Sequence, residues 1–362
     1  MAWSFDFGDT FSTYNMARVT SEGHWTSLTG IANAVTIAED GLQGIAPQFL
    51  VKNLLTTTFG RMLVARIRPT APQNGASGLL AILGSDGTLK FSINYNEVSG
   101  VITLHLPNGS SITSADPNAV LPNLQMVNLG LTGLLDGVNM YYAVRVNNVV
   151  IGDLTGQAAF ATTIPLSMIS PSRGFGSGVC FSQYAWMLSK TYSGTGGMPV
   201  NADWFGNLKR GVLRGDEDGQ YPAVQVGARW IPNSGTKYFS RLNETLSDGD
   251  TTRATNIVDP GGVPTAVDRM SIQLEDPPVT LVNIGAVQRR AVMKMQTGSG
   301  TARLFYGLTG SAGDTYDLTN VAVASSYNAE LRPLILDPRD NAAWNRAKLV
   351  NLDLGLECFD LA

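Results

Sequence analysis

Short segments in which apolar and polar residues alternate recur along the whole chain. An alternation with a period of two turns one side of an extended segment toward a core and the other toward solvent, so each such segment predicts β-strand. The segments in the first half lie at residues 61–69, 79–96, 100–112, 138–156 and 178–189. Strand signals that recur about every 8–12 residues are typical of sandwiches and barrels.

Turn residues divide several of these segments into hairpins. Asp86-Gly87 and Asn108-Gly109 place a glycine where a tight turn needs positive φ, and Asn147-Asn148 predicts a third turn. The large residues of the flanking strands are predicted to form the first core: Phe91, Ile93, Leu104, Tyr142, Val144 and Val146.

The second half repeats the β pattern after a break rich in Ser, Gly and Pro at residues 191–200. Its predicted strands lie at 208–213, 237–243, 269–275, 282–296 and 301–308. Two segments favour helix: 202–208, for one turn, and 341–352, for which an extended segment is the alternative. We therefore predict an all-β chain with two antiparallel, jelly-roll-like β-sandwich domains in tandem, at residues 1–198 and 199–362.

Composition narrows the choice of partners. Charged residues make up 15% of the chain, against about 25% in ordinary soluble proteins, and the formal net charge is −4. A polar but uncharged surface is typical of proteins that neighbouring copies cover, although a β-rich monomer has the same composition. Nucleic-acid binding is not expected, because it needs clustered cations and the short run Arg289-Arg290 with Lys294 is interpreted as a solvated face.

Neither a membrane segment nor a disulfide is expected. The N-terminal residues carry acid without a basic region, and no apolar run reaches the roughly 18 residues of a membrane helix. We expect a soluble chain made in the cytoplasm of whatever cell expresses it. Cys180 and Cys358 lie in different predicted domains among apolar neighbours and are interpreted as small buried residues.

No catalytic residue is predicted. His105 is expected to face solvent from a strand and His24 to lie in a loop, while Ser177 lies in a glycine-rich turn that lacks the nucleophile-elbow spacing. Carboxylates that suggest a glycosidase pair are interpreted as turn residues that bind the local backbone: Glu97, Asp116 and Asp136. The chain is therefore expected not to be an enzyme.

No metal or cofactor site is predicted either. Asp216–Gly219 and Asp248–Asp250 resemble fragments of calcium loops, but neither reaches the glutamate that completes an EF-hand, so both are interpreted as turns. Aromatic residues crowd the N-terminus, where they either pack into the first sandwich or anchor a neighbouring chain: Trp3, Phe5, Phe7, Phe11, Tyr14 and Trp25.

The order of strands in residues 1 to about 190 resembles the concanavalin A-like, laminin-G-like jelly roll. The stretches that carry the resemblance are RMLVARIRP, GTLKFSINYN with GVITLHLPNG, YYAVRVNNVVIG and FSQYAWML. The loop set of acid, Asn and aromatic residues with which lectins of that fold bind sugars is not found here.

Residues 198 to about 357 resemble a domain found at the end of tailed-bacteriophage virion proteins. The shared order begins with PVNADWFGNLKRGVLRGDEDG, continues through KYFSRLNETLSDGDTTRATN, DRMSIQLED and VNIGAVQRRAVMKM, and ends with LDPRDNAAWNRAKLVNLDLGLE. Arg253-Ala254 departs from the usual Tyr-Val after the Asp-Thr pair.

The resemblance implies a structural component of the virion, as capsid decoration or as a head or tail appendage. Its partners would be other copies of itself, with a trimer among the closed rings expected, and capsid or tail proteins. Two other functions stay open. One is a glycan-binding module for host attachment, and the other is a depolymerase that acts on host polysaccharide.

Overall fold

The computed structural model divides the chain into two compact units, the first with strands β1–β16 and the second with strands β17–β27. The first is described at residues 4–9, 27–29, 35–38, 41–44, 49–68, 76–96, 98–122, 125–173 and 180–190. The second is described at residues 213, 215–222, 230–232, 235, 254–256, 269–281, 284–295, 298–308, 315–326, 328–334 and 336–359. The predicted boundary between residues 198 and 199 lies outside these ranges.

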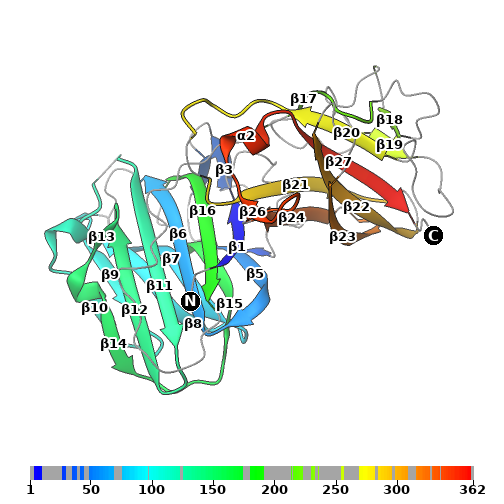
Figure 1. The fold of residues 1–362 in the computed structure, drawn as a ribbon. Coiled ribbons are helices and arrows are strands. Elements are labelled where there is room, and N and C mark those ends of the chain that lie inside the picture. The colour runs from blue at the N-terminus through cyan, green and yellow to red at the C-terminus, as the bar shows by residue number, and fades with distance from the viewer. Residues whose placement is uncertain are drawn as a thin grey trace. The chain divides into compact units, whose positions relative to one another are not determined.

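Two antiparallel sheets make up the first unit (Figure 1). The larger contains β1 (Ser4–Asp9), β3 (Val35–Ala38), β4 (Gly41–Gly44), β6 (Gly60–Arg68), β11 (Val127–Leu135), β12 (Asn139–Val146), β13 (Val149–Val150), β14 (Gly156–Ala159) and β16 (Cys180–Lys190). Its order is β13-β12-β11-β6-β16-β4-β3, with β1 beside β16 and β14 beside β12.

The smaller sheet of this unit packs against the larger one. It contains β2 (Ser27–Thr29), β5 (Phe49–Thr58), β7 (Ala76–Gly84), β8 (Leu89–Asn96), β9 (Ile102–His105), β10 (Ser111–Thr113) and β15 (Leu166–Arg173), in the order β10-β9-β8-β7-β15-β5-β2. Short 3-10 helices, η3 (Pro117–Ala119) and η4 (Gly152–Leu154), connect strands.

Burial follows the predicted alternation. All six residues predicted for the first core are buried: Phe91, Ile93, Leu104, Tyr142, Val144 and Val146. The predicted turns also form, since Gly87 and Gly109 have φ of 75° and 84°, and Asn147 and Asn148 have φ of 48° and 72°. In the Asn147-Asn148 turn both central residues have positive φ, which is the hairpin geometry whose twist matches that of the flanking strands.

A glycine sets how closely the two sheets approach. Gly133 of β11 lies against the ring of Phe91, which comes from β8 in the opposite sheet. A methyl group at position 133 would overlap that ring, so glycine at this position lets a large core residue fill the space between the sheets.

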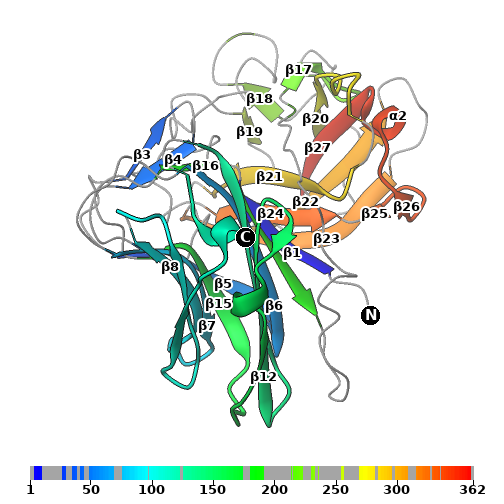
Figure 2. The same ribbon diagram turned by 90° about the vertical axis from the view of Figure 1, so that its left-hand side faces the viewer.

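The second unit is built on a five-stranded antiparallel sheet, which Figure 2 shows from another side. Its order is β17 (Gly215–Asp218), β20 (Arg269–Leu274), β27 (Leu352–Phe359), β22 (Ser299–Leu308) and β23 (Thr315–Ala324). Three strand pairs accompany it: β21 (Val287–Met293) with β24 (Asn328–Leu334), β18 (Trp230–Pro232) with β19 (Ala254–Asn256), and β25 (Leu336–Asp337) with β26 (Ala342–Ala343).

The second core joins these elements. Trp230, Met293 and Leu356 come from three different sheets and meet in one buried cluster with five further residues: Ile272, Ala302, Leu304, Val321 and Val323. The predicted all-β fold with antiparallel sandwiches is thus confirmed.

Two local predictions in the second unit are wrong. The sequence favours helix over 341–352, but only α2 (Arg346–Leu349) is helical. The backbone is extended at Asn345, before this single turn, and at Val350, after it, and Asn351 then takes the left-handed conformation with φ of 56° before β27 begins. The sequence predicts a turn at Asp216–Gly219, yet residues 215–218 form the edge strand β17, because they pair with β20.

The contact between Gly133 and Phe91 gives a stability prediction. Gly133→Ala should lower the free energy of unfolding by about 2 kcal/mol, because the added methyl displaces a ring in a packed core. Urea denaturation followed by tryptophan fluorescence measures the change. Gly152→Ala is the matched control, since no atom lies within 4 Å of a methyl group at that position. Equal midpoints for the two variants would contradict this account.

Candidate functional site

Among the described residues of the second unit, the carboxylates that are most deeply buried lie in the chain's C-terminal segment. Asp337, Asp353 and Glu357 are each 1% exposed or less. A buried carboxylate needs a cation or several hydrogen-bond donors, because burial alone strongly disfavours its charge. These three residues are therefore the first candidates for binding or catalytic chemistry.

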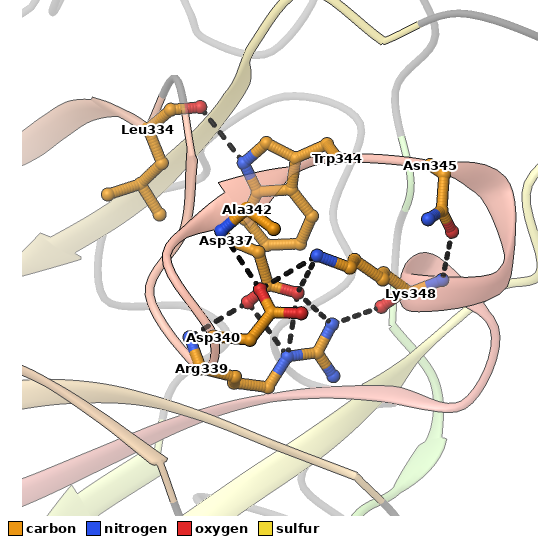
Figure 3. A network of polar contacts seen from close by, with 8 residues as sticks. All are labelled: Leu334, Asp337, Arg339, Asp340, Ala342, Trp344, Asn345 and Lys348. Carbon is orange, nitrogen blue, oxygen red and sulfur yellow. Dashed lines mark hydrogen bonds and ion pairs between the residues drawn. The ribbon is translucent and has the colours of Figure 1, made fainter.

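Asp337 is the centre of the polar network shown in Figure 3. The Arg339 guanidinium donates Nε to Oδ1 at 2.9 Å and Nη2 to Oδ2 at 2.8 Å. The Lys348 ammonium lies 3.7 Å from Oδ2 and 2.7 Å from Asp340 Oδ1. Arg339 Nη2 also donates to the Lys348 carbonyl oxygen at 2.6 Å, so the network joins the β25–β26 turn to α2.

Trp344 fixes the same segment from its apolar side. The indole is buried, and its Nε1 donates to the Leu334 carbonyl oxygen at 3.0 Å. The Arg339 guanidinium carbon lies 5.8 Å from the indole centroid, within the range of a cation–π contact. Asn345 caps α2 by accepting a hydrogen bond from the Lys348 amide at 3.1 Å. The segment is thus bound at several points along its length.

Glu357 of β27 pairs with arginines from both neighbouring strands. Arg269 Nε of β20 lies 2.9 Å from Oε2, and Arg303 Nη1 of β22 lies 3.2 Å from Oε1. Arg269 also donates Nη1 to the Tyr221 hydroxyl at 3.0 Å. Burial favours a lower pKa for Arg269, but its hydrogen bonds with Tyr221 and Glu357 outweigh burial and raise that pKa. The guanidinium is therefore a permanent structural cation.

Asp353, on the same face of β27, holds the segment after β17. Its Oδ2 accepts from the Gln220 amide at 2.6 Å and from the Ser271 hydroxyl at 3.4 Å. Gly219 lies so close to these two side chains that a methyl group there would meet Asp353 Oδ2 and Ser271 Oγ at 2.5 Å. Asp353 thus binds the backbone next to the acidic segment 215–219 that resembles a calcium loop.

Between these two carboxylates, an aromatic ring covers the strand. Phe305 is the cross-strand partner of Gly355 and lies directly over it. Tyr221 meets Phe305 edge-on with centroids 5.7 Å apart, and the Arg269 guanidinium lies within 6 Å of both ring centroids. One face of β27 is therefore a layer of alternating charge, ring and charge.

Each of these buried carboxylates is compensated. Arginine or lysine neutralises Asp337 and Glu357, and backbone and hydroxyl donors hold Asp353. Over the ranges that the structure describes, no group of three or more His, Cys, Asp or Glu side chains is arranged to hold a metal ion. In that same part of the chain, no helix is long and apolar enough to cross a membrane.

Three candidate residues of the first unit that the structure describes lie as predicted. His105 lies in β9 opposite Ser92 and Ser111 and is partly exposed. Asp116 accepts from the Asn118 amide at 2.8 Å, and Asp136 accepts from the Asn139 amide at 2.5 Å. Both carboxylates bind the local backbone, as turn residues do.

The interpretation of the basic run in the second unit is wrong for one residue. Arg289 is buried rather than solvated, and its guanidinium carbon lies 5.6 Å from the Tyr306 ring centroid. Lys294 is exposed, as a solvated face requires. Cys180 and Cys358 lie in strands of different units.

Several candidates lie outside the described residues, and their predictions stay untested: His24, Glu97, Ser177, Asp248–Asp250, Trp3, Phe11, Tyr14 and Trp25. Phe5 and Phe7 lie in β1, which pairs with β16, so the backbone of this aromatic segment joins the larger sheet of the first unit. Sequence reasoning missed Asp337, Asp353 and Glu357, although the alternation of Leu352, Leu354 and Leu356 marks the strand that carries two of them.

Comparisons with known proteins show no family for this chain. No protein-family model matches the chain, and no curated protein matches it. Among solved structures, Trypanosoma rangeli sialidase in complex with sialic acid aligns with 44% of this chain and 27% of its own, at 13% identity and a TM-score of 0.35. The chain thus spans about a quarter of the length of that sialidase.

Two smaller proteins align over most of their own length. Domain 4 of AbnA, a GH43 extracellular arabinanase from Geobacillus stearothermophilus, in complex with arabinotriose, covers 52% of this chain and 93% of its own at 11% identity and a TM-score of 0.33. The cellulose-induced protein Cip1 covers 54% and 94% at 12% identity and a TM-score of 0.31.

The network around Asp337 predicts a strong effect on stability. Asp337→Asn should lower the free energy of unfolding by about 2–4 kcal/mol, because it leaves the Arg339 cation buried without its counter-ion. Asp340→Asn should have a much smaller effect, since Asp340 is 51% exposed in its ion pair with Lys348 and solvent screens that pair. Chemical denaturation of both variants is the measurement, and similar losses would refute the central role of Asp337.

Proposed function

We propose that this chain is a non-enzymatic structural component of a tailed-phage virion that acts by self-association and by docking to other virion proteins. The proposal rests on one observation: residues from the two ends of the phage-like sequence pattern lie in contact in the folded chain. The opening of that pattern contains Gly219, its ending contains Asp353, and the two lie together through the hydrogen bond to the Gln220 amide.

The rest of the pattern supports the same interpretation. Its ending also supplies Asp337, Arg339 and Trp344, which hold the β25–β26 turn against α2. A sequence pattern whose members stabilise one another is expected of a domain used as a building block. A catalytic pattern would instead bring together groups with free acid–base capacity.

The second unit also presents apolar side chains in a fixed position. Val279 is 82% exposed at the tip of a turn, where the Leu281 amide donates to the Pro278 carbonyl at 3.0 Å. Arg346 Nε of α2 donates to the Pro277 carbonyl at 3.1 Å and so fixes the base of this turn. A side chain held in place before contact loses little entropy on binding, so Val279 is our candidate anchor.

Binding to phage particles tests the proposal. The full chain should cosediment with particles of the phage that encodes it, and on its own it should sediment as a closed oligomer, with a trimer as the expected form. Val279→Asp should weaken particle binding about tenfold or more, because it places a charge in an apolar contact. A monomer that does not bind particles would overturn the proposal.

Val98→Asp is the matched control for that experiment. Val98 is 63% exposed in the first unit, so the substitution adds the same charge to another accessible valine. Particle binding by this variant should equal that of the unchanged chain. Equal weakening by both variants would show that added negative charge alone opposes docking, and would remove Val279 as the anchor.

Glycan binding is the second candidate, and a polar face of the first unit favours it. Asn94, Thr103 and Thr113 lie opposite one another on β8, β9 and β10, and the two threonine hydroxyls are 3.0 Å apart. In the next row along the strands His105 and Ser111 are accessible, whereas Ser92, which pairs with His105, is buried. Hydroxyl, amide and imidazole groups on one face of a sheet provide the donors and acceptors that a sugar's hydroxyls need.

A glycan array with the full chain distinguishes the two candidates. If this face binds sugars, Asn94→Ala with Thr103→Ala should lose at least about tenfold in apparent affinity, because buried hydrogen bonds to the sugar are removed. The matched control is Asn118→Ala on η3, which lies outside these two rows. If the chain binds particles firmly and binds no glycan on the array, the structural role is supported and the glycan-binding role is excluded.

A further inference from the structure

Two hairpin turns of the first unit are built on the same hydrogen bonds. In the turn between β7 and β8, Asp86 Oδ1 accepts from the Thr88 amide at 3.0 Å and from the Thr88 hydroxyl at 2.7 Å. In the turn between β9 and β10, Asn108 Oδ1 accepts from the Ser110 amide at 3.0 Å and from the Ser110 hydroxyl at 2.7 Å. The centre of the first turn is a carboxylate, and the Lys90 ammonium lies 3.7 Å from its Oδ2, whereas the centre of the second is an amide and Ile112 holds the corresponding position.

The backbone of the two turns also matches. Gly87 and Gly109 have φ of 75° and 84°. Each donates its amide to the residue three positions before it, Gly87 to Gly84 at 2.9 Å and Gly109 to Leu106 at 3.0 Å. The second turn is closed further by the Leu106 amide, which donates to the Ser110 carbonyl at 2.9 Å.

We propose that Asn108 is a site of spontaneous deamidation, and that its turn is built to keep the aspartate that results. The proposal does not depend on the function of the chain. It rests on the hydrogen bonds that polarise the Asn108 amide and on the presence, elsewhere in the same unit, of an aspartate in an equivalent turn.

The reaction needs only water. The Gly109 backbone nitrogen attacks Asn108 Cγ and loses its proton to solvent, the Cγ–Nδ2 bond breaks, and ammonia leaves, which gives a five-membered succinimide. Water then adds to one of the two ring carbonyls and opens the ring to aspartate or to isoaspartate. No oxidant or reductant takes part, and the product carries one more negative charge.

The structure favours the first step in two ways. Negative charge develops on Asn108 Oδ1 as the ring closes, and the Ser110 amide and hydroxyl both point at that oxygen, as donors do in an oxyanion hole. Gly109 has no Cβ to obstruct ring closure, and nothing lies within 4 Å of the place where one would be. Residues 108–110 are exposed, so the turn can open at the bond from Gly109 to Leu106.

The Asp86 turn shows what the product would look like. The hydrogen bond from the Thr88 hydroxyl lowers the pKa of Asp86, so this arrangement of donors stabilises the ionised carboxylate. An aspartate at position 108 would receive the same two donors from Ser110. Hydrogen bonds to a charged acceptor are stronger than those to a neutral amide, which favours retention of the turn.

Two other asparagines differ from Asn108 in part of this arrangement. Asn96 accepts from two backbone amides, those of Val98 and Ser99, but Glu97 follows it and brings a side chain to the attacking nitrogen. The chain has one other Asn-Gly pair, Asn74-Gly75, which lies outside the described residues and is followed by Ala76 rather than by a hydroxyl residue.

Incubation of the full chain in mildly alkaline, heavy-oxygen water, followed by peptide mapping with mass spectrometry, tests the proposal. The peptide that contains Asn108 should convert steadily from amide to acid and take up heavy oxygen. An unchanged amide at position 108, under conditions in which the unfolded chain deamidates, would overturn it.

Two variants test the role of the donors. Ser110→Ala should slow conversion about threefold or more, because it removes one of the two hydrogen bonds to the developing charge. Asp86→Asn should create a second site that converts at a rate within about threefold of Asn108, since Thr88 offers the same donors. Faster conversion in Ser110→Ala, or an inert side-chain amide at position 86 in the second variant, would refute the assigned role.

Asn108→Asp tests whether the turn keeps its product. The variant should be at least as stable as the unchanged chain near neutral pH. A carboxylate stabilised in the folded state has a lowered pKa, so any stability gained should be lost as the pH falls through the acid range. A variant that is less stable at neutral pH would show that the turn does not accommodate the product.

Discussion

The second unit depends on one strand that is buried on both faces. One face of β27 carries Leu352 and Leu356 into apolar clusters, and the other carries Asp353, Gly355 and Glu357. Because β27 lies between β20 and β22, each charge is within reach of side chains from both neighbours. Arg269 and Arg303 compensate Glu357, and the backbone after β17 compensates Asp353.

The same constraint explains why so many residues of the sequence pattern are fixed together. A charge in a low-dielectric layer tolerates little displacement of its partners, since losing one partner costs far more than the pair gains over an apolar substitute. Gly219 and Gly355 belong to the arrangement as well, because a side chain at either position would occupy space that Asp353 or the Phe305 ring already fills. The buried carboxylates, the Phe305 ring and the two glycines therefore fit together in only one arrangement of the sheet.

Sequence reasoning succeeds where burial follows a simple alternation. Phe91 and Ile93 are predictable as core because polar residues separate them from their apolar neighbours. Gly87 and Gly109 are predictable as turns because few other residues adopt positive φ. Sequence reasoning fails for Arg289, which it places in solvent. It also misses the buried acidic residues of β27, because acidic residues are usually exposed. Partners that neutralise a buried charge come from distant strands, and no local pattern records them.

The two units differ in how they are stabilised. Described residues of the first unit form a mainly apolar sandwich that also buries Arg61, whereas the second unit relies on ion pairs around Asp337 and Glu357. The measurement that tests the structural role most directly is a reconstruction of the phage particle by electron cryomicroscopy. The account predicts density for both sandwiches at regular, symmetry-related positions on the head or tail. Purified particles that lack this chain altogether would contradict it.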